Sequence, residues 1–272
     1  MTKIAIIAGG GKLPLIIGKN LISKNFEVIF FLLEDVVDNK KYKDLDFINI
    51  NLKSVKKIIN LLKLNKIEKI LLAGSINRPS ISDINFDFQT IKLAKDLLFN
   101  NNGDNQLLES IKLFFNKNGF EYFDWTKYCS ELFVTDKHLT FFKPSKSAKT
   151  NLKKALNTFN IYGKLDIGQS IIVQNQIILG LEAAEGTDRL IMRCKELKKQ
   201  GDKGILVKLS KYNQSKILDI PTIGEQTISL LINNNYEGIF IEKNNCLIID
   251  KEKTIELANK NKIFISTCSK ID

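Results

Sequence analysis

The chain has 272 residues, 44% of them hydrophobic, and a formal net charge of +11 because 41 basic residues outnumber 30 acidic ones. Its longest apolar runs are far too short for a membrane span, and the apolar run before the first glycine is too short for a secretory leader, so we expect a cytoplasmic protein. A single histidine, His138, excludes histidine-rich metal centres and argues against serine-histidine catalysis, and the scattered cysteines without CxxC spacing indicate neither a zinc site nor a disulfide framework.

Short apolar runs alternate with helical patterns through the first half of the chain, which is typical of a parallel sheet built from βαβ units. The predicted strands are residues 3–9, 26–33, 46–50, 68–74 and 120–124. The predicted helices are residues 13–25, 55–65, 88–100 and 104–118. The helix at 55–65 is amphipathic, because Val55, Ile58 and Leu62 fall on one face.

The periodicity lapses at residues 135–147, where small polar residues and Pro144 cluster, and this segment is predicted to be a linker. Beyond it we expect a helix at 148–161, a hairpin at 169–183, a helix at 187–199 and a strand at 204–209. A helix after residue 226, a strand at 237–242, an apolar stretch at 246–250, and a final helix and strand complete the expected second half. The expected fold class is α/β, with a Rossmann-like parallel-sheet domain at 1–134 and a second α/β domain at 148–272. A ligand cleft is expected between the two domains.

Three glycines follow the first predicted strand. The turn at Gly9, Gly10 and Gly11 can offer bare amides to a phosphate, or it can be only a tight turn from strand to helix. It supplies the first two glycines of a dinucleotide-binding fingerprint, and Glu34 stands where a ribose-binding acid would. However, Pro14 takes the place of the third glycine, so the fingerprint is only partial.

Two further segments of the first half carry candidate ligand contacts. The sequence AGSINRP at 73–79 forms a second glycine turn at the end of a strand, from which Arg78 would point into the same crevice as the glycine loop. Asp104 opens a helix, where it is either part of a ligand rim or an ordinary N-cap.

The densest polar constellation surrounds the predicted hairpin. Its members are Asp166, Gln169, Glu182, Glu185 and Asp188, with Arg189 and Arg193 beside them. Carboxylates beside guanidinium groups can jointly hold a hydrated Mg²⁺ and the phosphate that it bridges. Arginine is rare in this lysine-rich chain, so we expect anion contacts from Arg78, Arg189 and Arg193, with structural salt bridges as the alternative.

Asp219 comes directly before a Pro-Thr-Ile-Gly turn. An aspartate at such a place can be an N-cap or can form an Asx-turn, and the sequence leaves this alternative open.

The motifs together are recognisable. AGGGKLP, AGSINRP, GDNQLLESI, LDIGQSIIVQNQIILGLEAAEGTDRLIMR, GILVK and LDIPTIGEQTI occur in an order and spacing that resembles the UDP-2,3-diacylglucosamine pyrophosphatases of the LpxI type. The resemblance covers essentially the whole chain, and EAAEGTD and DIPTIG are its most specific parts.

The resemblance implies a Mg²⁺-dependent hydrolase of lipid A biosynthesis that splits UDP-2,3-diacylglucosamine into 2,3-diacylglucosamine 1-phosphate and UMP. It implies Asp219 and Asp188 as catalytic residues and Glu185 and Asp188 as metal ligands. The implied substrate-binding residues are Gly10, Gly11, Leu13, Arg78, Asp104, Gln169, Gly186, Thr187, Arg193, Lys208 and Thr222. Arg189 replaces an expected small residue, which weakens any role for it.

A lipid-linked UDP-sugar substrate implies peripheral contact with the inner membrane, and the lysine excess suits anionic headgroups. We expect no nucleic-acid partner and allow for a homo-oligomer. The phenylalanine-rich stretches KLFFNKNGFEYF and LTFFKP can supply an apolar wall for the acyl chains, although burial in the core is the commoner fate of such residues. The alternatives are an NAD(P)-dependent oxidoreductase and a non-catalytic protein that binds a nucleotide sugar or a lipid.

Overall fold

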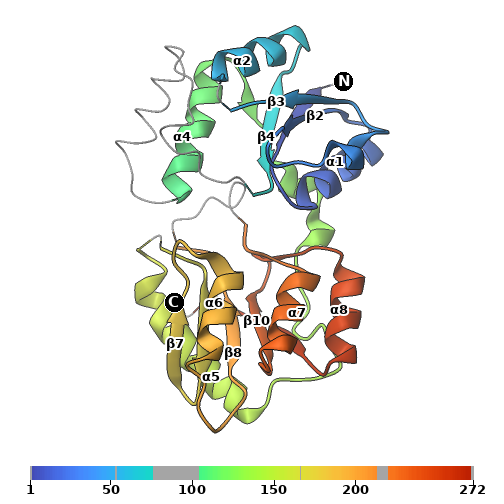
Figure 1. Ribbon diagram of the computed structural model, residues 1–272. Helices are drawn as coiled ribbons and strands as arrows, with labels where there is room; N and C mark the ends of the chain where they lie inside the picture. Colours follow the sequence, from blue (N-terminus) through green and yellow to red (C-terminus); the bar gives the residue numbers. More distant parts are fainter. Residues whose placement is uncertain (1, 53, 76–103, 166, 213–219, 271–272) are drawn as a thin grey trace. The chain divides into compact units, whose positions relative to one another are not determined.

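The computed structural model describes residues 2–52, 54–75, 104–165, 167–212 and 220–270, with 104–107 described by their backbone alone. The chain divides into two compact units, Met1–Ser130 and Glu131–Asp272 (Figure 1). Each unit contains its own sheet and its own helices, so the expected α/β fold class is confirmed. Among the helices in these ranges, none combines the length and the apolar character that crossing a bilayer requires.

The first unit is built on a five-stranded parallel sheet of order β3-β2-β1-β4-β5. Its strands are β1 (Lys3–Ala8), β2 (Glu27–Leu33), β3 (Phe47–Ile50), β4 (Lys69–Ala73) and β5 (Glu121–Tyr122). Its helices are α1 (Leu13–Ser23), α2 (Val55–Leu64) and α4 (Asp104–Lys117), with short 3₁₀ turns at Asn39–Tyr42 and Trp125–Tyr128. The predicted helix at 88–100 lies outside the described residues.

The continuous apolar runs of β1, β2 and β4 are explained by their position in the middle of a parallel sheet, where strands are covered on both faces. In β1, every residue from Ile4 to Ala8 is buried, and the register places Ile6 between Phe30 and Leu71. The apolar face predicted for the helix at 55–65 is also buried in α2. The order of the strands reverses between β1 and β4, which is where open α/β sheets commonly bind ligands.

The second unit is built on a five-stranded mixed sheet of order β12-β10-β8-β6-β7. Its strands are β6 (Ser170–Gln174), β7 (Ile177–Leu181), β8 (Ile205–Lys208), β10 (Gly238–Glu242) and β12 (Phe264–Cys268), and a two-stranded sheet joins β9 (Thr222–Ile223) to β11 (Leu247–Ile248). Its helices are α5 (Lys146–Tyr162), α6 (Gly186–Lys195), α7 (Glu225–Asn233) and α8 (Lys251–Lys260), and a 3₁₀ turn at Ser130–Leu132 crosses the boundary between the two units. Strands β8, β10 and β12 are parallel, whereas β6 and β7 form the antiparallel hairpin predicted at 169–183.

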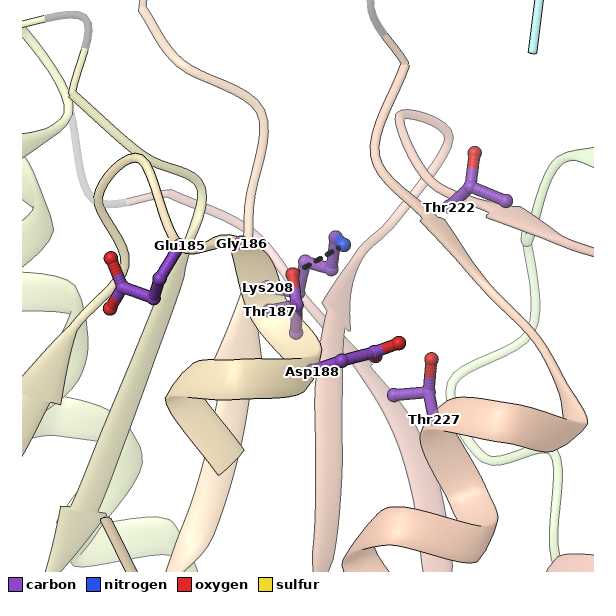
Figure 2. A pocket seen from close by; sticks show the side chains of 7 residues that line it. All are labelled: Glu185, Gly186, Thr187, Asp188, Lys208, Thr222 and Thr227. Atoms are coloured by element: carbon purple, nitrogen blue, oxygen red, sulfur yellow. Dashed lines mark hydrogen bonds between the residues drawn. The ribbon is translucent and has the colours of Figure 1, made fainter. Parts of the chain in front are cut away.

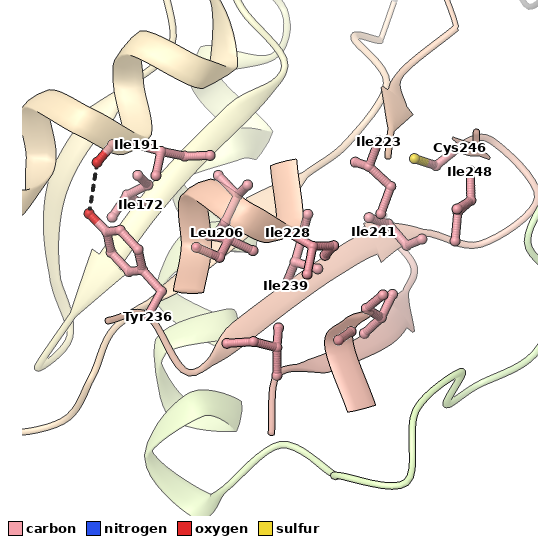
Figure 3. Packing of buried hydrophobic residues seen from close by; sticks show 14 of the residues in the cluster. Ile172, Ile191, Leu206, Ile223, Ile228, Tyr236, Ile239, Ile241, Cys246 and Ile248 are labelled. Carbon is pink, nitrogen blue, oxygen red and sulfur yellow. Dashed lines mark hydrogen bonds between the residues drawn. The ribbon is translucent and has the colours of Figure 1, made fainter. Parts of the chain in front are cut away.

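Side chains that alternate along these strands divide the core of the second unit into two layers. Ile239 and Ile241 of β10 pack with α6, α7 and α8, and Figure 3 shows this layer, in which the Tyr236 hydroxyl donates to the Ile191 carbonyl oxygen at 3.3 Å. Phe240, between them, packs on the other face with α5. The period of two along the strand thus buries both faces of the sheet.

The residues predicted as a linker pack against the second unit. The Leu139 amide donates to the Ile265 carbonyl oxygen, and the Thr267 amide donates to the Lys137 carbonyl oxygen, each at 2.9 Å. Residues 137–139 therefore run antiparallel to β12. Ser145 then caps α5, because its hydroxyl accepts the Ala148 amide at 3.0 Å.

Candidate functional site

The candidate site lies at the edge of the second sheet where its parallel strands end. Ser170, at the start of β6, pairs with Lys208, at the end of β8, because these two strands are antiparallel. The chain leaves β7 at the same edge and turns through residues 182–185 into α6. Carboxyl ends of parallel strands are where open α/β sheets place their ligands.

A pocket of about 300 Å³ opens at this edge (Figure 2). Its lining residues are Glu185, Gly186, Thr187, Asp188, Lys208, Thr222 and Thr227. They come from the first turn of α6, the end of β8, β9 and the first turn of α7. Gly186 adopts φ +78°, a conformation that favours glycine, and this allows the chain to enter α6 directly from the turn. The Gly186 amide already donates to the Ala183 carbonyl oxygen at 3.3 Å. The amides that follow it in the first turn of a helix have no acceptor within the helix, so they make the pocket suitable for an anion.

Lys208 is the buried cation of the pocket, with 8% of its surface exposed. Its ammonium group donates to the Thr187 hydroxyl oxygen at 2.9 Å, as the dashed line in Figure 2 shows. Within the described part of the chain, no carboxylate lies within ion-pair distance of this ammonium group. A buried ammonium without a paired carboxylate favours the binding of an anion.

Thr187 connects this lysine to Glu182. Its hydroxyl donates to Glu182 Oε1 at 3.0 Å, and the other carboxylate oxygen of Glu182 accepts the Gln169 amide at 3.2 Å. The Ser170 hydroxyl also lies 3.1 Å from that of Thr187. Because the Thr187 proton points toward Glu182, the lone pairs of its oxygen face Lys208 and hold the ammonium group in place.

Asp188 contributes the carboxylate that faces the pocket. One of its oxygens accepts a hydrogen bond from Gln226 Nε2 at 2.6 Å, and Figure 2 shows its carboxylate directed toward Thr227. Thr222 lines the opposite side, and its hydroxyl donates to the Ile220 carbonyl oxygen at 2.9 Å. The Lys208 ammonium group can donate to a phosphate oxygen, whereas the Asp188 carboxylate can only accept hydrogen bonds and would meet a phosphate through a bridging cation or water.

Glu185 lines the pocket but turns its carboxylate away from Asp188 (Figure 2). Glu185 Oε1 accepts hydrogen bonds from Nε and Nη2 of Arg193 at 3.0 and 2.8 Å, and Arg193 also donates to the Leu181 carbonyl oxygen at 2.8 Å. Burial alone would raise the pKa of Glu185, but the hydrogen bonds from Arg193 and from the Ala183 amide outweigh it and hold that pKa below its usual value. The sequence left open whether Arg193 contacts an anionic ligand or forms a structural salt bridge, and the salt bridge with Glu185 is present.

Comparison with known proteins shows that both units match one family. The family model of the LpxI N-terminal domain matches residues 3–132, and that of the LpxI C-terminal domain matches residues 135–266. The chain belongs to the LpxI family. A relative from Caulobacter vibrioides, UDP-2,3-diacylglucosamine pyrophosphatase LpxI, is 28% identical over 274 residues, which covers 97% of each chain. The resemblance inferred from the motifs is therefore confirmed.

The LpxI motifs include oxygen donors that are compatible with Mg²⁺, although among the described residues only one carboxylate faces the pocket. Asp188 is that carboxylate, and the hydroxyl groups of Thr222 and Thr227 line the same space. In the described ranges, no three histidine, cysteine or acidic side chains come together as a ready-made metal site. Because Mg²⁺ is usually held by one or two carboxylates together with substrate phosphates and water, Asp188 would hold it jointly with the substrate.

The glycine loop of the LpxI N-terminal domain packs tightly against the end of β4. The amides of Gly9 and Gly10 donate to the carbonyl oxygens of Ala73 and Ser75, at 2.8 and 2.7 Å. A side chain at Gly9 would lie 2.3 Å from the Ser75 carbonyl oxygen, so glycine is required there for close backbone contact. The tight-turn alternative thus describes Gly9 and Gly10. The substrate contacts of Gly10, Gly11 and Leu13 stay predictions. The Gly10 amide already donates a hydrogen bond to the Ser75 carbonyl oxygen.

Several predicted site residues lie outside the described residues: Arg78, Asp166, Asp219 and the side chain of Asp104. Arg189 is described and exposed on α6.

The sequence reasoning missed three residues of the site: Ser170, Gln226 and Thr227. Gln226 and Thr227 follow the Pro-Thr-Ile-Gly turn directly, so the first turn of the helix predicted there was the available signal. No comparable signal was available for Ser170, because its role depends on contact with a helix that begins sixteen residues later.

Proposed function

We propose that the chain hydrolyses the pyrophosphate bond of UDP-2,3-diacylglucosamine with the help of Mg²⁺, releasing 2,3-diacylglucosamine 1-phosphate and UMP for lipid A synthesis. Family membership over both units and the activity for which the Caulobacter relative is named support the proposal. The structural observation that carries it is the buried Lys208 ammonium group beside the first turn of α6, in a pocket that also presents Asp188.

Pyrophosphate hydrolysis depends on charge neutralisation and on an aligned water more than on covalent catalysis. In the proposal, Lys208 and the amides that follow Gly186 in the first turn of α6 bind phosphate oxygens. A bound Mg²⁺ would neutralise further phosphate charge, and Asp188 is the described residue that would hold it. Water adds to one phosphorus atom, the bond from that phosphorus to the bridging oxygen breaks, and a carboxylate accepts the proton of the water. Asp219, which lies outside the described residues, is proposed as this base or as a second metal ligand.

The substrate carries two acyl chains, so the proposal includes peripheral association with the cytoplasmic face of the inner membrane. The net charge of +11 supports attraction to anionic headgroups. A homo-oligomer stays a prediction.

The proposal is tested by incubating the purified protein with UDP-2,3-diacylglucosamine and measuring UMP, with Mg²⁺ or with EDTA. We expect release of UMP with Mg²⁺ and none with EDTA, and strong loss of release in Asp188→Asn and Asp219→Ala. Asp136→Asn, which changes an exposed aspartate of the same unit, is the matched control. Absence of UMP from the wild type would contradict the function, and undiminished release in EDTA would contradict the metal dependence.

A further inference from the structure

Phe141 is the most exposed large hydrophobic side chain in the described residues, at 87%, and its neighbour Phe142 is 38% exposed. The two belong to the LTFFKP stretch that the sequence suggested as a wall for acyl chains. The other stretch suggested for this wall was KLFFNKNGFEYF. Its Phe115, Phe120 and Phe123 are instead buried in the core of the first unit.

The exposure of Phe141 is not the result of a loose chain end. The Thr140 hydroxyl donates to the Phe142 carbonyl oxygen at 3.0 Å and accepts the Ile265 amide at 2.9 Å. The Phe141 amide donates to Asn259 Oδ1 at 2.8 Å. The turn at residues 140–143, called the Phe141 turn below, is therefore fixed to β12 and to the end of α8 while it presents a phenyl ring to solvent.

Lysines surround the Phe141 turn. Exposed lysines lie in the turn itself, in the first turn of α5 and at the end of α8: Lys143, Lys146, Lys149, Lys260 and Lys262. The pKa of the nearby His138 is lowered by burial and then by the charges of Lys137, Lys143 and Lys149. The adjacent acid, Glu237, is already bound by the amide and the hydroxyl of Ser145, at 2.8 and 3.0 Å.

The Phe141 turn lies at the opposite edge of the sheet from the pocket. The chain runs antiparallel to β12, with Lys137 beside Thr267 and Leu139 beside Ile265, so Phe141 lies beyond the start of that strand. The pocket is at the carboxyl end of β8, which is parallel to β12 through β10. The Phe141 turn therefore does not line the pocket.

We propose that the Phe141 turn and its lysines dock the protein on the surface of an anionic lipid bilayer, a proposal that rests on the proposed function because that function requires a membrane-resident substrate. A second copy of this chain would bring like charges together. An anionic bilayer instead offers negative headgroups to the lysines and an apolar boundary layer to the phenyl rings, at the same depth. Docking retains the protein at the membrane without involving the pocket.

The test is co-sedimentation with vesicles of phosphatidylglycerol and phosphatidylcholine in equal parts, compared with pure phosphatidylcholine. We expect binding to the anionic vesicles only, weakened by salt. The double variants Phe141→Ser with Phe142→Ser, and Lys260→Gln with Lys262→Gln, should each lower the partition coefficient about tenfold or more. Matched controls are Ile161→Ser, which changes a side chain that is 73% exposed at the other end of α5, and Lys153→Gln with Lys154→Gln, on its exposed face.

Turnover separates docking from catalysis. With substrate in detergent micelles, the Phe141 variant should release UMP at the wild-type rate, whereas with substrate in anionic vesicles its rate should fall. Unchanged vesicle binding by the Phe141 variant, or an equal loss in the Ile161 control, would overturn the docking proposal. Lack of turnover by the wild type in micelles would instead contradict the proposed function and leave the vesicle-binding result standing.

Discussion

The Thr187 hydroxyl group fixes the positions of two charged side chains, because it lies between the Lys208 ammonium group and the Glu182 carboxylate. It accepts from Lys208 and donates to Glu182, and it does so within the first turn of α6. Glu182 acts through Thr187 and does not line the pocket, so it is a positioning residue. Its negative charge also lies close enough to offset part of the cost of burying the ammonium group.

Replacement of Glu182 by glutamine tests this positioning role. The Glu182→Gln variant keeps the size of the side chain but loses its charge. One of the two carboxylate oxygens is replaced by an NH₂ group, which cannot accept a hydrogen bond such as that from the Gln169 backbone N–H. Loss of a charge-assisted hydrogen bond costs about 1.5–3 kcal/mol, so we expect kcat/KM for UMP release to fall about tenfold or more.

The control for this variant is Glu196→Gln, which changes an exposed glutamate at the end of α6. Its kcat/KM should equal that of the wild type. Equal kcat/KM of Glu182→Gln and the wild type would contradict the positioning role of Glu182.

The salt bridge between Arg193 and Glu185 predicts a pH dependence of stability. The pKa of Glu185 is lowered in the folded state from its ordinary value of 4.5, so the ionised carboxylate stabilises the folded state fully at pH values above 4.5. This stabilisation is lost as the pH falls from 4.5 through the lower pKa of the folded state. Arg193→Gln should therefore be less stable than the wild type by about 0.5 kcal/mol near neutral pH, since the pair is partly exposed. The difference in the free energy of unfolding should shrink below pH 4.5, measured by urea denaturation. A difference that stays constant down to pH 3 would contradict the assignment.

At the scale of elements, the site depends on how one hairpin and one helix meet. β7 leads through a four-residue turn into α6, and the close approach is possible because Gly180 lies against α6, where a side chain would be only 2.5 Å from Cys194 Sγ. This places the start of α6 beside the end of β8, so that Thr187 and Lys208 come into contact.

Gly186→Ala tests the entry into α6. No atom lies within 4 Å of the position that the added methyl group would take, so the effect of the variant comes from the backbone alone. A residue with a side chain at φ +78° costs about 1 kcal/mol relative to glycine. We expect the free energy of unfolding to fall by about that amount and the KM for the substrate to rise. Gly186→Asn, which tolerates the left-handed region better, should recover part of both losses; no difference between the two variants would contradict this explanation.

The elements of the chain were largely predictable, because strand and helix periodicities are local properties. The buried face of α2 and the hairpin of β6 and β7 show this clearly. The small sheet of β9 and β11 was not predicted. Its strands are only two residues long, Thr222–Ile223 and Leu247–Ile248, and α7 and β10 separate them in the sequence. The packing of residues 137–139 along β12 was also missed, since a polar, proline-containing segment gives no signal of its partner.

At the scale of the whole molecule, the family was visible in the order of the motifs, and both domain matches confirm it. The geometry of the site was less predictable. Sequence spacing placed Glu185 and Asp188 near one edge of the sheet, but it could not show that Arg193 turns Glu185 away from Asp188. Such orientations depend on side-chain contacts between segments, which residue types and spacing do not specify.

The central claim is that the pocket at the end of β8 binds the diphosphate through Lys208. The measurement that tests it most directly is kcat/KM for UMP release from UDP-2,3-diacylglucosamine by Lys208→Met, beside Lys164→Met as an exposed control in the same unit. We predict a loss of roughly 10²- to 10³-fold for Lys208→Met, because a preorganised charge is removed from the transition state, and wild-type activity for the control. A folded Lys208→Met protein with the kcat/KM of the wild type would contradict the account.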